Sequence, residues 1–150
     1  MHKLSPFFQL LLVTLFSCHW LIGEANFKIN DRVNSVYRAI VRIEVVSERG
    51  SNGRMLKSGS TGSGVIIDAT GLVVTNHHVA GKATRLTCRL YDGEELGADL
   101  LGADALTDLA VLRLRLSDRP ENAPPLQTAV FGNSDRVKVG DICFAMGSPA

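Results

Sequence analysis

The sequence predicts an all-β domain, a barrel or a sandwich, that follows a short helix. The main observation is a series of short apolar runs along the chain, each bounded by residues that favour turns. A second observation is the alternation of apolar and polar residues within some of these runs. The third is size, because 150 residues, 45% of them apolar and 21% charged, are enough for one globular domain with its own core.

The predicted elements start with a helix over residues 29–38, where apolar side chains recur at helical spacing. A strand follows over residues 39–46, because apolar residues alternate there and many are β-branched. Residues 47–62 are rich in glycine and serine with scattered charges, so we expect an exposed, mobile loop. Further apolar runs occur at residues 65–67, 72–75, 85–91, 96–101, 109–116 and 142–146.

Turn residues separate these runs and complete the prediction of many short strands. In each turn, glycine or proline stands close to an aspartate, at residues 68–71, 91–93, 118–120 and 138–141. A proline-bearing connection at residues 118–125 is too short to be a domain boundary, and no internal repeat is evident. We therefore expect one domain after the N-terminal segment.

The first residues are typical of an export signal. Lys3 gives the start a positive charge, and residues 7–16 are almost wholly apolar, about the length of a signal core. Gly23 and Ala25 then place small residues at the two positions that determine cleavage. We therefore expect a signal peptide over residues 1–25 and an exported protein, in the periplasm or outside the cell.

Two alternatives for this segment stay open. Residues 10–22 are nearly continuously apolar, so they could remain as an uncleaved membrane anchor, although they are short for a span. Residues 15–18 resemble a bacterial lipoprotein box, which would attach a lipid at Cys18. Either alternative would tether the protein to a membrane, with the domain outside the cytoplasm.

The charge balance and the cysteines restrict the kinds of partner and bound metal that we expect. A formal net charge of +1 without a basic or acidic tail argues against nucleic acid as the main partner. In an oxidising compartment Cys88 and Cys143 could pair, but the strand pattern around Cys88 favours an unpaired, buried thiol. Two cysteines and the adjacent pair His77 and His78 do not make a zinc pattern, so we expect no metal.

His77 and His78 end an apolar run and are the histidines that remain once the signal is removed. If histidine catalysis occurs, one of the two performs it, because neighbouring strand residues face opposite ways. Thirty residues after His78, Asp108 stands immediately before another apolar run. A carboxylate at the rim of a barrel can accept the Nδ1 proton of an imidazole, which is how a base is oriented in a nucleophilic triad.

The segments around these residues resemble the trypsin-like serine proteases of the HtrA (Deg) family. Residues 61–68, Thr-Gly-Ser-Gly-Val-Ile-Ile-Asp, and residues 71–79, Gly-Leu-Val-Val-Thr-Asn-His-His-Val, carry most of the resemblance. Later segments agree in the right order, at residues 91–94, 104–112, 131–135, 139–141 and 145–149. The resemblance covers the chain from about Ser35 onward. It implies that residues 26–150 are the first six-stranded antiparallel barrel of a two-barrel protease domain, without the second barrel.

The resemblance also implies roles for two residues. His78, the histidine before Val79, matches the catalytic histidine, and His77 stands where relatives often have asparagine. Asp108 matches the catalytic aspartate, which orients the imidazole and stabilises the imidazolium formed when the base takes a proton. Asp104, by contrast, is expected to be a solvated turn residue.

We expect no nucleophile in this chain. Ser134 follows Gly-Asn, as the family's catalytic serine does, but Asp135 stands where glycine is needed for an oxyanion hole. In the family, moreover, the nucleophile lies well after the segment at residues 139–149. Ser63 lies between two glycines that the family pattern makes structural, and Ser148 precedes a proline as a turn residue.

The leading hypothesis is the N-terminal part of an HtrA-type serine endopeptidase, inactive by itself. The resemblance implies polypeptide substrates, namely unfolded or damaged exported proteins, assembly into a homo-oligomer (a trimer or larger), and no cofactor. One alternative is a non-catalytic, chaperone-like relative that binds peptides and lacks the serine. Another is a self-standing small β-barrel used for binding, which would fold alone with a cooperative melt.

Overall fold

The computed structural model describes residues 31–51 and 54–147. The chain divides into two compact units, Met1–Asn34 and Ser35–Ala150, and every strand of the described residues lies in the second. Residues 31–37 are helical, so the predicted helix is confirmed where it falls within the described residues. The predicted signal peptide lies outside them.

No helix within the described residues is both long and apolar enough to cross a membrane.

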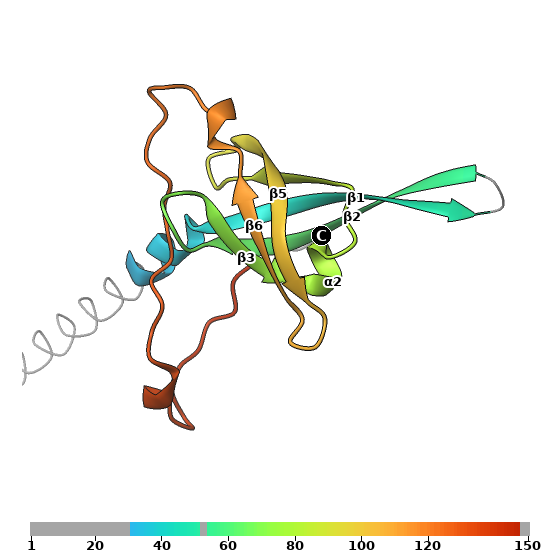
Figure 1. Ribbon diagram of the computed structural model, residues 1–150. Helices are drawn as coiled ribbons and strands as arrows, with labels where there is room; N and C mark the ends of the chain where they lie inside the picture. Colours follow the sequence, from blue (N-terminus) through green and yellow to red (C-terminus); the bar gives the residue numbers. More distant parts are fainter. Residues whose placement is uncertain (1–30, 52–53, 148–150) are drawn as a thin grey trace, which may run out of the picture. The chain divides into compact units, whose positions relative to one another are not determined.

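Six antiparallel strands close into a barrel with the order β1-β2-β3-β6-β5-β4. Figure 1 shows this barrel and labels all of its strands but β4. The sequence prediction of an all-β, six-stranded antiparallel barrel is therefore confirmed. The strands are β1 (Ile40–Ser51), β2 (Arg54–Ile66), β3 (Leu72–Asn76), β4 (Arg85–Arg89), β5 (Glu95–Asp104) and β6 (Leu109–Leu114). Three short helical turns accompany them: α2 (His77–Ala80), η1 (Leu116–Asp118) and η2 (Ser134–Arg136).

The barrel interior is filled by the inward-facing residue of each alternating pair, as the pleat of a strand requires. The largest fully buried side chains are Ile43, Ile66, Leu96, Leu112, Val41, Val73 and Cys88. Gly64 lets two of them approach, because a Cβ at that position would lie 2.7 Å from Val73 Cγ1 and 2.9 Å from Ile43 Cδ1. Buried Thr75 satisfies its hydroxyl by donating to the carbonyl of Ser63, at 2.7 Å.

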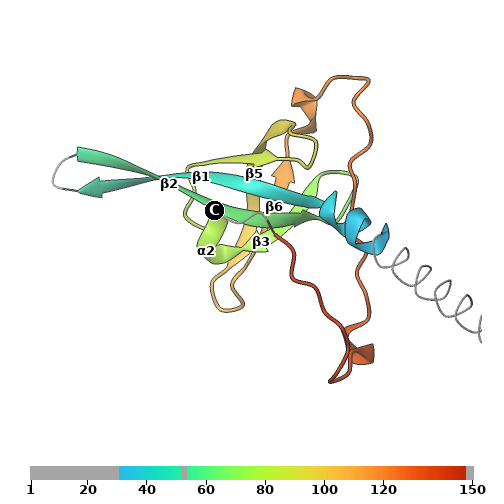
Figure 2. The same cartoon turned by 180° about the vertical axis from the view of Figure 1, so that it is seen from behind.

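The predicted loop over residues 47–62 is wrong. β1 and β2 continue as a paired hairpin past the barrel, with Ser47 opposite Ser58 and Gly50 opposite Met55 (Figures 1 and 2). Backbone hydrogen bonds hold this part together, and its side chains are mostly exposed. A ribbon with no buried face needs no apolar alternation, so its sequence looks like that of a loop.

The apolar run at residues 142–146 does not form a strand. It belongs to the segment after the barrel, residues 115–147, in which η1 and η2 are the regular elements, and the side chains of the run are exposed. A strand needs a partner edge for its backbone groups. Because β4 and β1 pair and close the barrel, the six strands offer this segment no edge at the closure.

The two cysteines outside the N-terminal segment are both free thiols. Cys88 lies inside the barrel, as its strand pattern predicts, while Cys143 is exposed. Burial raises the pKa of the Cys88 thiol to about 12, because the thiolate would lose its hydration. Cys88 is therefore a small apolar core residue rather than a reactive one.

Candidate active site

The two residues singled out by the sequence meet where β3 and β6 run side by side. His78 is the second residue of α2, which begins directly after β3, and Asp108 is the residue before β6. The two strands pair in register, with Asn76 opposite Leu109. The pairing therefore brings the start of α2, labelled in Figure 1, next to Asp108, whose carbonyl accepts from His77 N.

The imidazole of His78 contacts the carboxylate of Asp108 directly, with Nδ1 2.7 Å from Oδ2. The other carboxylate oxygen, Oδ1, accepts the backbone N–H of His78 at 2.9 Å. A carboxylate can only accept, so this contact favours the tautomer with the proton on Nδ1. Nε2 then carries the lone pair and is the nitrogen that can take a proton from another group.

Hydrogen bonds keep Asp108 ionised. The backbone N–H of His78 lowers the pKa of Asp108 most, followed by the hydrogen bond from the imidazole, while desolvation acts in the opposite direction. Side-chain exposures of 69% for His78 and 44% for Asp108 leave the pair open to solvent. An imidazole held by an ionised carboxylate at an accessible surface can serve as a general base.

A glycine beneath α2 determines how closely this helix approaches β2. A Cβ on Gly62 would lie 2.5 Å from Cγ1 and 2.7 Å from Cγ2 of Val79, the residue after His78. Real Cβ contacts are never so short, so Val79 fits only because residue 62 has no side chain. Gly62 and Gly64 are thus structural, because each makes room for a neighbouring side chain.

Comparison with known proteins shows which proteins this chain resembles. The family model described as "Trypsin-like peptidase domain" matches residues 62–150, which include both His78 and Asp108. A probable periplasmic serine endoprotease, DegP-like, of Pseudomonas fulva (strain 12-X) is 41% identical over 100 residues, covering 67% of this chain and 19% of the relative. The protein of the same name from Rickettsia conorii (strain ATCC VR-613 / Malish 7) is 41% identical over 93 residues, covering 62% of this chain and 17% of the relative.

The solved structures point the same way. An HtrA-type protease with a decapeptide matches at a TM-score of 0.64 and 27% identity, covering 75% of this chain and 38% of that one. Another HtrA-type protease structure, with a tripeptide, matches at a TM-score of 0.60 and 32% identity, covering 73% of this chain and 31% of that one. The chain belongs to the HtrA (Deg) family of trypsin-like serine proteases. It spans about a fifth of the length of the curated HtrA relatives above.

The side chains of His77 and Asp104, also weighed from the sequence, have partners outside the His78–Asp108 contact. The ring of His77 packs against Gly81, where a Cβ would lie 2.4 Å from its Cδ2. Asp104 is a turn residue, as expected, and its carboxylate accepts from Leu106 N and Thr107 Oγ1, both at 2.9 Å. These hydrogen bonds lower the pKa of Asp104, the one from the backbone of Leu106 most.

The candidate serines do not complete the site within the described residues. Ser134 begins η2, and Figures 1 and 2 both place this red turn away from α2. Ser63 lies on β2, where its carbonyl accepts from Thr75, and Ser148 lies outside the described residues. Across residues 31–51 and 54–147, no three His, Cys, Asp or Glu side chains are grouped so as to hold a metal ion.

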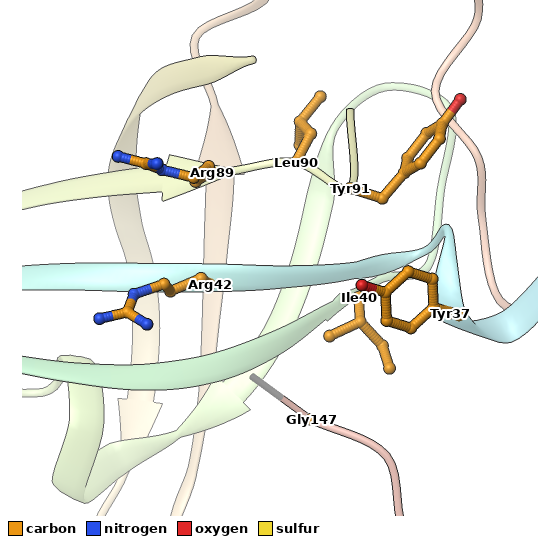
Figure 3. A pocket seen from close by; sticks show the side chains of 7 residues that line it. All are labelled: Tyr37, Ile40, Arg42, Arg89, Leu90, Tyr91 and Gly147. Carbon is orange, nitrogen blue, oxygen red and sulfur yellow. The ribbon is translucent and has the colours of Figure 1, made fainter. Parts of the chain in front are cut away.

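A hollow of about 240 Å³ on the outer side of β1 and β4 shares no residue with this site. Figure 3 shows its lining: Tyr37, Ile40, Arg42, Arg89, Leu90, Tyr91 and Gly147. Arg42 and Arg89 are direct cross-strand partners and lie side by side there. Glu44 Oε1 stands 4.0 Å from one guanidinium and 3.9 Å from the other, which offsets part of their charge.

The sequence analysis missed Asn76. Its side-chain amide contacts Asp108 twice, as described below. The available signal was its position, because Asn76 ends the strand that leads into the two histidines.

Proposed function

We propose that this chain supplies the general base and its orienting carboxylate to an HtrA-type serine endopeptidase. His78 is the base and Asp108 orients it. The supporting observation is the 2.7 Å contact between Nδ1 and Oδ2 in a member of a serine protease family. The serine, the oxyanion hole and the specificity pocket come from a second barrel in the complete protein.

The proposed chemistry follows from the tautomer that Asp108 favours. Nε2 of His78 takes the proton of the serine hydroxyl as its oxygen attacks the peptide carbonyl. The ionised carboxylate stabilises the imidazolium that results, and His78 then donates the proton to the leaving amine. No metal or organic cofactor takes part. By itself the 150-residue chain is inactive, because it lacks the attacking group.

The proposed setting follows from the relatives, which are named periplasmic serine endoproteases. We propose an exported protein, with residues 1–25 as its signal peptide, that cleaves unfolded or damaged polypeptides as a homo-oligomer, a trimer or larger. An open, solvent-accessible pair is consistent with a polypeptide substrate, which reaches the base as an extended chain.

The test compares the complete protein with the 150-residue chain on unfolded casein. His78→Ala and Asp108→Asn should each lower kcat/KM in the complete protein, Asp108→Asn by about four orders of magnitude if the pair acts as a triad pair does. His77→Ala and Asp104→Asn are matched controls, since they change the same residue types nearby and keep the backbone N–H that His77 donates to Asp108. Both variants should stay within about tenfold of wild type.

Three results would count against the proposal. Casein cleavage by the 150-residue chain would mean that its nucleophile lies within these residues. Retained cleavage by the His78→Ala variant would show that His78 is not the general base. A complete protein that suppresses casein aggregation without cutting it would favour the chaperone-like relative.

A further inference from the structure

Asp108 receives hydrogen bonds from three consecutive residues at the start of α2. Its backbone carbonyl accepts from His77 N at 3.1 Å and from Asn76 Nδ2 at 3.0 Å. Its Oδ1 accepts from His78 N, while Oδ2 accepts from the imidazole and from Asn76 Nδ2, at 3.3 Å. We propose that Asn76 is a positioning residue, whose amide fixes the Asp108 carboxylate against His78. This inference rests on the proposed function of the pair.

The amide of Asn76 can face Asp108 in only one way. Both of its contacts on Asp108 are oxygens that accept, so the –NH₂ group must point toward them and the amide oxygen away. The two donor hydrogens of one nitrogen thus span the carbonyl and the carboxylate of the same residue. They tie the side chain of Asp108 to its own backbone.

Asn76 occupies the N-cap position of α2, yet it does not cap the helix. An asparagine there ordinarily accepts a backbone N–H with its side-chain oxygen, but Asn76 makes no such bond. Asp108 accepts the N–H groups of His77 and His78 instead, one with its carbonyl and one with Oδ1. The side-chain amide of Asn76 therefore donates to Asp108 instead of accepting a backbone N–H of α2.

The backbone of Asp108 also needs this support. Its φ of +55° makes it the only non-glycine residue with a left-handed backbone among those that the structure describes. Aspartate tolerates this conformation better than most residues, and it persists where neighbours hold it. Two of the donors to Asp108, His77 N and Asn76 Nδ2, act on its carbonyl and so hold this peptide in place.

These hydrogen bonds fix the orientation of the Asp108 carboxylate relative to the imidazole of His78. With donors on both oxygens and two on Oδ2, rotation of the carboxylate would break at least one hydrogen bond. Without Asn76, the imidazole would be the partner that remains on Oδ2. Asn76 itself need not touch the substrate, so its loss should change turnover and not substrate binding.

The experiment replaces Asn76 by aspartate, which keeps the shape but exchanges the donor for an acceptor, and by alanine. In the complete protease, both variants should lower kcat about 10- to 100-fold, the size of losing one hydrogen bond to a charged group, with KM unchanged. In Asn76→Asp the rising limb of kcat/KM against pH should also move to higher pH, because a second carboxylate stabilises the imidazolium. Asn122→Asp adds the same charge at an exposed site and should leave both quantities unchanged.

A second readout does not depend on activity. In the 150-residue chain labelled with ¹⁵N-histidine, the Nδ1–H resonance of His78 should shift or vanish in both Asn76 variants and stay in Asn122→Asp, at equal β content by circular dichroism. If the wild-type complete protein cleaves nothing, the proposed function fails, while this comparison still decides on Asn76. An unchanged resonance in Asn76→Asp, or a kcat equal to that of wild type, would overturn the inference.

Discussion

At the scale of single residues, Asp108 has two tasks. It caps the first N–H groups of α2 and it holds the imidazole of the residue that it caps. Because one carboxylate serves both, the position of His78 relative to Asp108 is set by backbone and side chain together. The same hydrogen bonds that orient the pair also lower the pKa of Asp108.

This lowered pKa predicts how Asp108 affects stability against pH. The group binds its proton more weakly in the folded chain than in the unfolded one, whose pKa is about 3.9. Its stabilising contribution is therefore present above about pH 4 and is lost as the pH falls through the folded pKa. Asp108→Asn should flatten the loss of stability below pH 4, measured by urea unfolding at several pH values. Asp135→Asn, in the exposed η2, should retain the wild-type slope; equal slopes for both variants would contradict the prediction.

At the scale of elements, the sequence could predict those whose side chains divide between core and solvent. The alternation in β1 over residues 40–46 follows from one buried face. The predictions were wrong for the distal hairpin, residues 47–51 and 54–58, and for the run at residues 142–146, and the two errors have opposite causes. The hairpin is held by backbone pairing without burial, while the run has apolar side chains without a strand to pair with.

The contact of α2 with β2 gives a prediction at this scale. Gly62→Ala should push Val79, and with it His78, away from the barrel, since the new Cβ would overlap Val79. Overpacking of this kind costs about 1–3 kcal/mol of stability, and we expect kcat of the complete protease to fall as well. The double variant Gly62→Ala with Val79→Ala should recover much of both losses, because the smaller side chain makes room.

The matched control for this experiment lies on the same strand. A Cβ on Gly59 would meet nothing closer than Val45 O, at 3.9 Å, so Gly59→Ala should be neutral. The prediction would be wrong if Gly62→Ala were also neutral in thermal melts and casein assays, or if Val79→Ala failed to compensate.

At the scale of the whole molecule, the strand pattern by itself predicts a barrel or a sandwich, and the resemblance to the HtrA family selects the barrel and the pair of His78 and Asp108. Short alternating runs predict the strands, and a carboxylate just before a strand predicts a place at the rim, where it can accept from an imidazole. The role that we propose for Asn76 could not be predicted, since it depends on the pairing of β3 with β6 and on an uncommon backbone conformation at Asp108. A single asparagine at a strand end carries no such signal.

The segment after the barrel leaves large apolar side chains in solvent. Val130, Phe131 and Ile142 are 91%, 77% and 79% exposed. Apolar side chains gathered on one exposed segment favour association with another surface. We expect the 150-residue chain to self-associate through this segment, and the second barrel that we propose for the complete protein to cover it.

Phe131→Ser combined with Ile142→Thr should therefore have different effects in the 150-residue chain and in the complete protease. In the 150-residue chain it should reduce self-association in sedimentation velocity without changing the melting of the barrel, because both side chains lie outside the core. In the complete protease the same change should lower the melting temperature, since buried apolar area is lost there. Met55→Ser removes an exposed apolar side chain from the distal hairpin. It should leave both the self-association of the 150-residue chain and the melting temperature of the complete protease unchanged. A wild-type chain that stays monomeric with a sharp thermal transition would contradict the prediction and would support the self-standing barrel.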